Sequence, residues 1–152
     1  RHNHLRLRQS RSGHAARKDS GMTDTLNLDQ QHTAEVARLN ILARRRQLPG
    51  VQYSHTHALR EHLHGDDPDP AKRTATFATN ALRLAQIIAA APIDPENDPW
   101  KEGDFGVVEM DSTKIYWKID YYSDLTRNWG SEAPWDDTQT VRQLTMMLPS
   151  DY

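Results

Sequence analysis

The sequence predicts an α+β protein in which two main helices pack on one face of a small antiparallel sheet of about three strands. The first observation behind this fold class is that apolar residues before residue 92 recur at close to helical spacing. The second is that the spacing then changes to the two-residue alternation of strands. The third is the length of 152 residues, which suffices for one core but not for two.

The first 21 residues are rich in Arg, His, Ser and Gly, and Leu5 and Leu7 are almost their only large apolar residues. Such a composition cannot bury enough apolar surface to fold. We therefore expect residues 1–25 to be a disordered tail and residues 26–152 to form a single domain. Because the chain begins with Arg and Met22 follows Gly21, we interpret the tail as sequence that is not native, with a genuine basic arm as the alternative.

The first helix is predicted within residues 23–50, where a Pro-Gly pair at 49–50 stops the apolar period. Thr33 is its candidate N-cap. The three arginines at 44–46 are expected in its last turn, because cations there favour the helix dipole.

A second helix is predicted over residues 71–92, where Pro92 ends an apolar stripe. The stripe consists of Phe77, Leu84, Ile87, Ile88 and Ala91. Asn80 and Arg83 should then face outward. Residues 51–70 are ambiguous, because a short strand or turn there leads into a helical turn and a Pro-rich loop.

Three strands are predicted at residues 104–111, 113–122 and 138–148. Asp111 and Ser112 fit the centre of a two-residue hairpin turn between the first two strands. That register assigns five apolar residues to a core face, namely Val108, Met110, Ile115, Trp117 and Ile119. In the third strand, Leu144, Met146 and Leu148 should join the same core.

The composition excludes several classes of protein. The chain has no cysteine, so disulfides, thiolate metal sites and a cysteine nucleophile are impossible. It has no apolar run long enough for a membrane-spanning helix and no glycine-rich phosphate-binding motif. Residues 1–92 carry 14 Lys and Arg against 8 Asp and Glu, whereas residues 93–152 carry 5 against 13. The acidic second half favours a protein partner over nucleic acid.

The candidate functional surface combines one strand with the acidic loop before it. The outward row of residues 113–122 is Tyr116, Lys118, Asp120 and Tyr122, and the loop adds Asp98 and Asp104. Tyr side chains are effective at recognition surfaces. Two carboxylates with separated pKa values could instead do acid–base chemistry or hold Mg²⁺. The structural alternative is that Lys118 and Asp120 form an ordinary surface ion pair.

His55 and His57 are weak candidates for a metal site, because a His-x-His pair on a strand places both rings on one face. No recognised metal-ligand spacing accompanies them. We therefore predict no metal and no cofactor, and we assign no catalytic residue.

Several motifs in the second half are specific enough to indicate a family. They are Asn97-Asp98-Pro99, Glu102, Asp104-Phe105-Gly106, Lys118 to Tyr122, Gly130-Ser131 with Pro134, and Leu144-Thr145, Met147-Leu148 and Tyr152. With them, residues 96–152 closely resemble the bacterial Domain of Unknown Function family 3768. The likeness is tenuous over residues 35–92 and absent before Met22, and Ser123-Asp124 departs from the family pattern.

The resemblance implies a small cytoplasmic protein that is frequent on plasmids and integrated elements of alphaproteobacteria. It implies no activity, cofactor or catalytic residue. Our first hypothesis is a non-enzymatic protein-interaction or accessory factor of mobile elements, with an anti-defence factor as one form. The alternatives are a metal-dependent hydrolase or nuclease-like enzyme that uses loop and strand carboxylates, and a structural homodimer joined through its sheet. In each case we expect no membrane contact.

Overall fold

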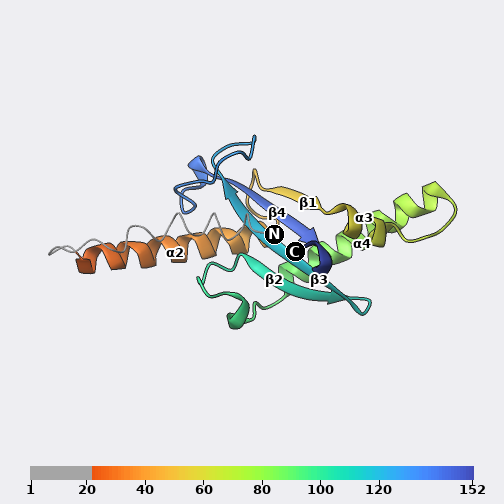
Figure 1. The fold of residues 1–152 in the computed structure, drawn as a ribbon, viewed down its shortest axis with the longest axis horizontal. Coiled ribbons are helices and arrows are strands. Elements are labelled where there is room, and N and C mark those ends of the chain that lie inside the picture. Colours follow the sequence, from red (N-terminus) through yellow and green to blue (C-terminus); the bar gives the residue numbers. More distant parts are fainter. Residues whose placement is uncertain (1–21) are drawn as a thin grey trace.

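The computed structural model describes residues 22–152, which contain three helices and one four-stranded sheet (Figure 1). The fold is therefore α+β, as predicted, with one strand more than expected. The helices are α2 (Met22–Arg44), α3 (His57–His64) and α4 (Pro70–Ala90). The strands are β1 (Gln52–His55), β2 (Phe105–Met110), β3 (Thr113–Tyr122) and β4 (Val141–Met147). Three short 3-10 helices are η2 (Pro95–Asn97), η3 (Asp137–Gln139) and η4 (Pro149–Asp151). Of the tail predicted over residues 1–25, residues 1–21 lie outside the described residues, whereas residues 22–25 already belong to α2.

Helix α2 is longer than predicted. It begins at Met22, so Thr33 lies inside the helix and the prediction that it is the N-cap is wrong. No Gly or Pro interrupts residues 22–44, so nothing in the chain stops the helix before Thr33. The helix ends at Arg44, and Arg46 adopts a left-handed backbone conformation with φ 57°.

The arginines at the end of α2 do not simply line its last turn. Arg44 is buried, and its Nη1 donates to the carbonyls of Ile88 and Ala91 at 3.2 and 2.9 Å. Arg44 therefore satisfies the free carbonyls at the end of α4. Its guanidinium also lies 5.4 Å from the ring centroid of Trp117, whereas that of Arg46 lies 3.8 Å from the ring centroid of Tyr53.

The sheet has the strand order β1-β4-β3-β2. Strands β2, β3 and β4 form the predicted antiparallel set, and β1 is the additional strand, parallel to β4. Its four residues are too few and too polar for periodicity to reveal them. Pairing makes them a strand, with Tyr53 beside Leu144 and His55 beside Met146.

The β2–β3 hairpin has the predicted register. Val108 pairs with Ile115 and Gly106 with Trp117, around the two-residue turn at Asp111 and Ser112. Both turn residues have positive φ, 51° and 66°, which is the backbone twist that such turns need. Gly106 is required by the neighbouring strand, because a Cβ atom there would lie 2.4 Å from the indole nitrogen of Trp117.

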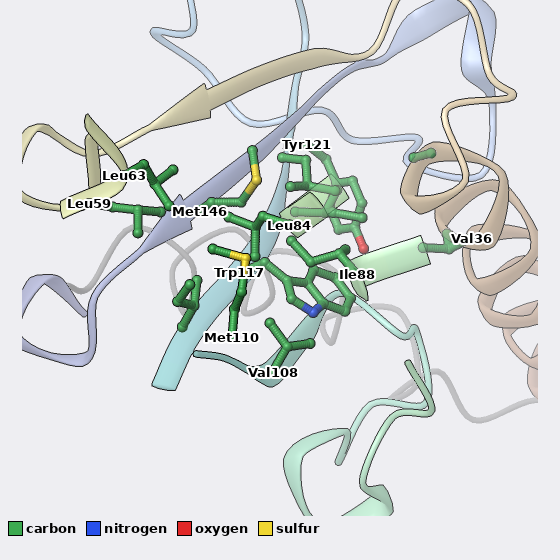
Figure 2. Packing of buried hydrophobic residues seen from close by; sticks show 14 residues of the cluster. Val36, Leu59, Leu63, Leu84, Ile88, Val108, Met110, Trp117, Tyr121 and Met146 are labelled. Carbon is green, nitrogen blue, oxygen red and sulfur yellow. The ribbon is translucent and has the colours of Figure 1, made fainter. Parts of the chain in front are cut away.

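The core lies between the helices and one face of the sheet, and α4 crosses behind the strands in Figure 1. Figure 2 shows Leu59 and Leu63 of α3 on one side of this core and Ile88 of α4 close to Trp117. All five apolar residues predicted for the core face of the hairpin are buried. Asn80 was expected to face outward, but it is half-buried because its amide donates to the carbonyl of Leu63 at 2.9 Å.

Candidate functional site

The face of the sheet opposite to the helices is called the outer face below. Because side chains alternate along a strand, Tyr116, Lys118, Asp120 and Tyr122 project to it while Trp117 and Ile119 project into the core. The paired registers place neighbours of this row on the same face. They are Phe105 and Val107 of β2, Gln143, Thr145 and Met147 of β4, and Ser54 of β1.

Lys118 and Asp120 form an ion pair of 2.8 Å on the outer face. The exposed fraction of their side chains is only 18% and 2%, respectively. A pair so shielded differs from the ordinary surface ion pair that was the alternative, because removing one partner would leave a poorly solvated charge. The pair is therefore largely shielded from solvent.

A chain of polar contacts continues from this pair across the sheet. Arg127 donates from Nη1 to Oε1 of Gln143 at 2.8 Å, and the amide of Gln143 donates to the hydroxyl of Ser54 at 2.9 Å. Gln143 pairs with Asp120 across β3 and β4. Arg127 comes from the loop 123–130, which is tied back to β3 by the isolated bridge between Tyr122 and Gly130. These side chains form a polar strip to which three strands and one loop contribute. The strip consists of Lys118, Asp120, Gln143, Ser54 and Arg127.

An aromatic cluster flanks the polar strip. The ring of Phe105 meets those of Tyr116 and Tyr152 at centroid distances of 5.4 and 5.1 Å, and the two tyrosine rings are 5.7 Å apart. All three contacts have the edge-to-face geometry that aromatic pairs favour. Tyr152 reaches the cluster from the end of the chain, after η4.

Tyr122 lies at the other end of the row. Burial raises the pKa of its phenol, and the negative charge of Asp120 raises the pKa further, against the opposing effect of Arg127. The phenol is therefore protonated at neutral pH and remains a hydrogen-bond donor.

Asp98 is engaged within its own loop. Its Oδ1 accepts hydrogen bonds from the backbone N–H groups of Glu102 and Gly103, both at 3.0 Å. Asp94 accepts likewise from the N–H of Glu96 at 3.0 Å at the start of η2. These carboxylates therefore hold the loop in shape, which is a common use of Asp in turns.

Asp104 lies on the opposite side of the sheet from Asp120. Its carbonyl accepts the N–H of Ile119 at 2.8 Å, so the two residues are opposite each other, and their side chains share the helix-covered face. Asp104 has an exposed fraction of 0%. Because the sheet separates the two carboxylates, they cannot act together on one substrate or one metal ion.

The sequence analysis missed a buried polar cluster beneath the sheet, around Asn40 of α2. Its amide nitrogen donates to the phenol oxygen of Tyr121 at 2.8 Å and to the carbonyl of Glu102 at 3.0 Å. The phenol of Tyr121 donates to Oε1 of Glu102 at 3.0 Å. Nε of Arg142 donates to Oδ1 of Asn40 at 3.2 Å. The available signal was Asn40 itself, a polar residue four positions after Val36 and three before Ala43 on the apolar face of the helix.

Arg142 connects this cluster to the loop before β4. Its guanidinium pairs with Asp137 at 3.1 Å, donates to the carbonyl of Pro134, and lies 5.6 Å from the ring centroid of Tyr121. Burial lowers the pKa of Arg142, and electrostatic interactions with Tyr121 and Asp137 oppose that shift. The cluster is fully enclosed, so it positions β3, β4 and α2 rather than contacting a ligand.

His55 and His57 are not arranged as a pair of metal ligands. The strand ends at His55, Thr56 caps α3, and His57 is the first residue of that helix, so the one-face geometry of a strand does not apply. His55 packs edge-on against Phe77 at 5.5 Å, whereas His57 is exposed. Within residues 22–152, no three His, Cys, Asp or Glu side chains are grouped as a metal site would require.

The comparisons with known proteins identify the family of this chain. Over the described part of the chain, no helix has both the length and the apolar character that crossing a membrane requires. No curated protein and no solved structure matches the sequence. The family model described as "Protein of unknown function (DUF3768)" matches residues 64–151. The match includes β2, β3, β4 and all of α4, and so extends further towards the N-terminus than the residues with the clearest motifs. Because it covers more than half of the chain, this protein belongs to the DUF3768 family.

Proposed function

We propose that this protein is a non-enzymatic binding module that holds a protein partner on the outer face of its sheet. The observation that carries the proposal is that no helix within residues 22–152 covers this face, and yet its side chains are engaged in contacts with one another. The ion pair of Lys118 and Asp120 and the cluster of Phe105, Tyr116 and Tyr152 are examples. Side chains that are already ordered lose little conformational entropy when a partner binds.

The charge of the outer face supports a polypeptide rather than a nucleic acid as the partner. Lys118 is neutralised by Asp120, and Lys114 lies directly opposite Glu109 in the hairpin. A sheet that binds single-stranded nucleic acid needs aromatic rings together with an excess of Lys and Arg for the phosphates. Here the aromatic rings are present without that excess.

The positions of the carboxylates support binding rather than catalysis. Asp98 is engaged by two backbone N–H groups, and Asp104 and Asp120 are separated by the sheet. The hydrolase hypothesis required these carboxylates to converge. The resemblance noted from the sequence supports two further parts of the proposal, a cytoplasmic location and a role in mobile genetic elements or against host defence.

The experiment that tests the proposal places a photo-crosslinking phenylalanine analogue at Tyr116 or Tyr122 in bacteria. These substitutions keep an aromatic ring at each position. Matched controls carry the analogue at Leu82 or Gln86, which are exposed on α4. We expect a discrete protein adduct from the outer-face positions and none from the controls.

A second measurement decides whether the captured protein binds specifically. The purified partner should protect backbone amides of β3 and β4 from hydrogen exchange and bind with lower affinity to the Tyr116→Ala variant. Equal capture from α4 and the outer face, or protection confined to the helices, would contradict the proposal.

A further inference from the structure

Strand β2 forms one edge of the sheet, at its lower margin in Figure 1. The hairpin register determines which of its backbone groups face β3. In a two-residue hairpin, the residues that flank the turn exchange hydrogen bonds, and every second residue before them does the same. Met110, Val108 and Gly106 therefore bond to β3. The hydrogen bond from the N–H of Ile119 to the carbonyl of Asp104 continues this series.

The alternate residues of β2 present their backbone groups to the open edge. They are Phe105, Val107 and Glu109, and their N–H and C=O groups find no hydrogen-bond partner within residues 22–152. Proteins usually protect such an edge with Pro, Lys, a bulge or a covering segment. Residues 105–110 contain neither Pro nor Lys, Glu109 is their single charged residue, and they pair with β3 without a bulge.

We propose that a second copy of this chain adds its own β2, antiparallel, to this edge, with the two-fold axis passing through Val107. Strand addition of this kind satisfies the free backbone groups of both edges at once. In that register Val107 lies opposite Val107 of the second copy, and Phe105 lies opposite Glu109. The N–H and C=O groups of all three outward residues of each copy then form hydrogen bonds with the other copy, which gives about six intermolecular hydrogen bonds.

The side chains fit this self-pairing. Val107 is 36% exposed, and pairing would place it against an identical apolar residue. Each Glu109 would face a phenyl ring rather than a second carboxylate, so no like charges would be opposed. Within its own copy, each Glu109 is already opposite Lys114. A partner strand with Lys or Arg along its length suits this edge less well, because Glu109 is the only carboxylate in β2.

The other edge of the sheet is less suited to a second copy. Strand β1 has four residues, whereas β2 has six. Pairing through β2 would also make the two outer faces continuous. The aromatic cluster of each copy, which begins at Phe105, would then lie next to the shared strands. This inference concerns a separate surface from the proposed binding face and holds or fails independently of it.

The absence of cysteine allows a position-specific test with the full chain. Across a hydrogen-bonded antiparallel pair, the Cα atoms are about 5.5 Å apart, which is within the range that a disulfide spans. The Val107→Cys variant should therefore form a disulfide-linked dimer under mild oxidation. The Glu109→Cys variant should not, because its two thiols would be four strand positions apart, about 13 Å. Equal crosslinking of the two variants, or crosslinking of neither, would overturn the proposal.

The mass in solution provides the second test. Light scattering of the unmodified chain should show a mass that rises from one chain towards two as the concentration increases. Val107→Lys should remain monomeric, since a charge on the edge opposes strand addition. Leu82→Lys, at an exposed apolar site on α4, should dimerise normally. A monomeric wild-type chain, or a dimer that persists in folded Val107→Lys, would show that β2 is not the interface. If Val107→Lys does not fold, the crosslinking result decides.

Discussion

The side-chain amide of Asn40 in α2 lies 2.8 Å from the phenol oxygen of Tyr121 in β3, at a site closed to solvent. The two residues are 81 positions apart in the chain. The amide nitrogen of Asn40 also donates to the carbonyl of Glu102, and the amide oxygen of Asn40 accepts from Arg142. A single side chain thus links the first helix, the loop before β2 and two strands.

Replacing Asn40 should therefore be costly. Asn40→Leu keeps a similar volume but leaves the phenol, the carbonyl and the guanidinium without this partner in a buried site. We expect a loss of about 3 kcal/mol in the free energy of unfolding, measured by urea denaturation. Gln30→Leu, at an exposed position of the same helix, should change it by less than about 0.5 kcal/mol. Similar losses for both variants would show that Asn40 is not the link described here.

Gly106 should be required only because Trp117 lies against it. A Cβ atom at this position would meet three atoms of the indole at 2.4–2.6 Å. Gly106→Ala should lower the free energy of unfolding by about 2 kcal/mol through overpacking. The same change in a Trp117→Leu background should have little effect, because the obstructing ring is gone. Additive effects in this double-mutant cycle would exclude the steric explanation.

The ion pair of Lys118 and Asp120 allows stability and binding to be separated. Lys118→Met alone removes the Lys118 cation from beside the shielded carboxylate of Asp120 and should destabilise by about 3 kcal/mol. The double variant Lys118→Met with Asp120→Leu should recover most of that loss, because an apolar pair of similar volume needs no charge compensation. If the outer face binds a partner through this pair, the double variant should fold and yet lose the partner. Full binding by the folded double variant would remove the pair from the proposed interface.

His55 should make the protein less stable in mild acid. Its Nε2 is buried without a hydrogen-bond partner in the described residues, and burial lowers the pKa of the ring. The charges of Arg60 and Arg46 lower the pKa further. The folded state therefore binds the proton less readily than the unfolded state. Stability should be intact above the unfolded pKa of about 6.5 and should fall as the pH drops below it.

Thermal unfolding between about pH 7.5 and pH 5 measures this effect on both sides of the reference pKa of histidine. His55→Leu removes the titrating ring and should therefore flatten the decline in melting temperature. The apolar Leu side chain suits the contact with Phe77. His57→Ala removes an exposed ring and should leave the decline unchanged. An unchanged decline in His55→Leu would assign the acid sensitivity to other groups.

Local signals in the chain predicted the hairpin and the second helix well. The alternation around Asp111-Ser112 defined both the turn and the face of each strand, since a shift of one residue would move every apolar side chain to solvent. The apolar stripe of residues 71–92 likewise placed Leu84 and Ile88 in the core. The start of α2 was misplaced, because Thr33 has the chemistry of a cap but lies within an uninterrupted helix.

The sequence by itself determined the α+β class, the hairpin register and the outward direction of Tyr116, Lys118, Asp120 and Tyr122. These features depend on side chains close together in the chain and on the two-residue period of a strand. Only the tertiary structure decided that β1 joins β4, that Arg44 satisfies the end of α4, and that Asp104 and Asp120 lie on opposite sides of the sheet. Each of these depends on which distant segment supplies the neighbour, and no local period records that choice.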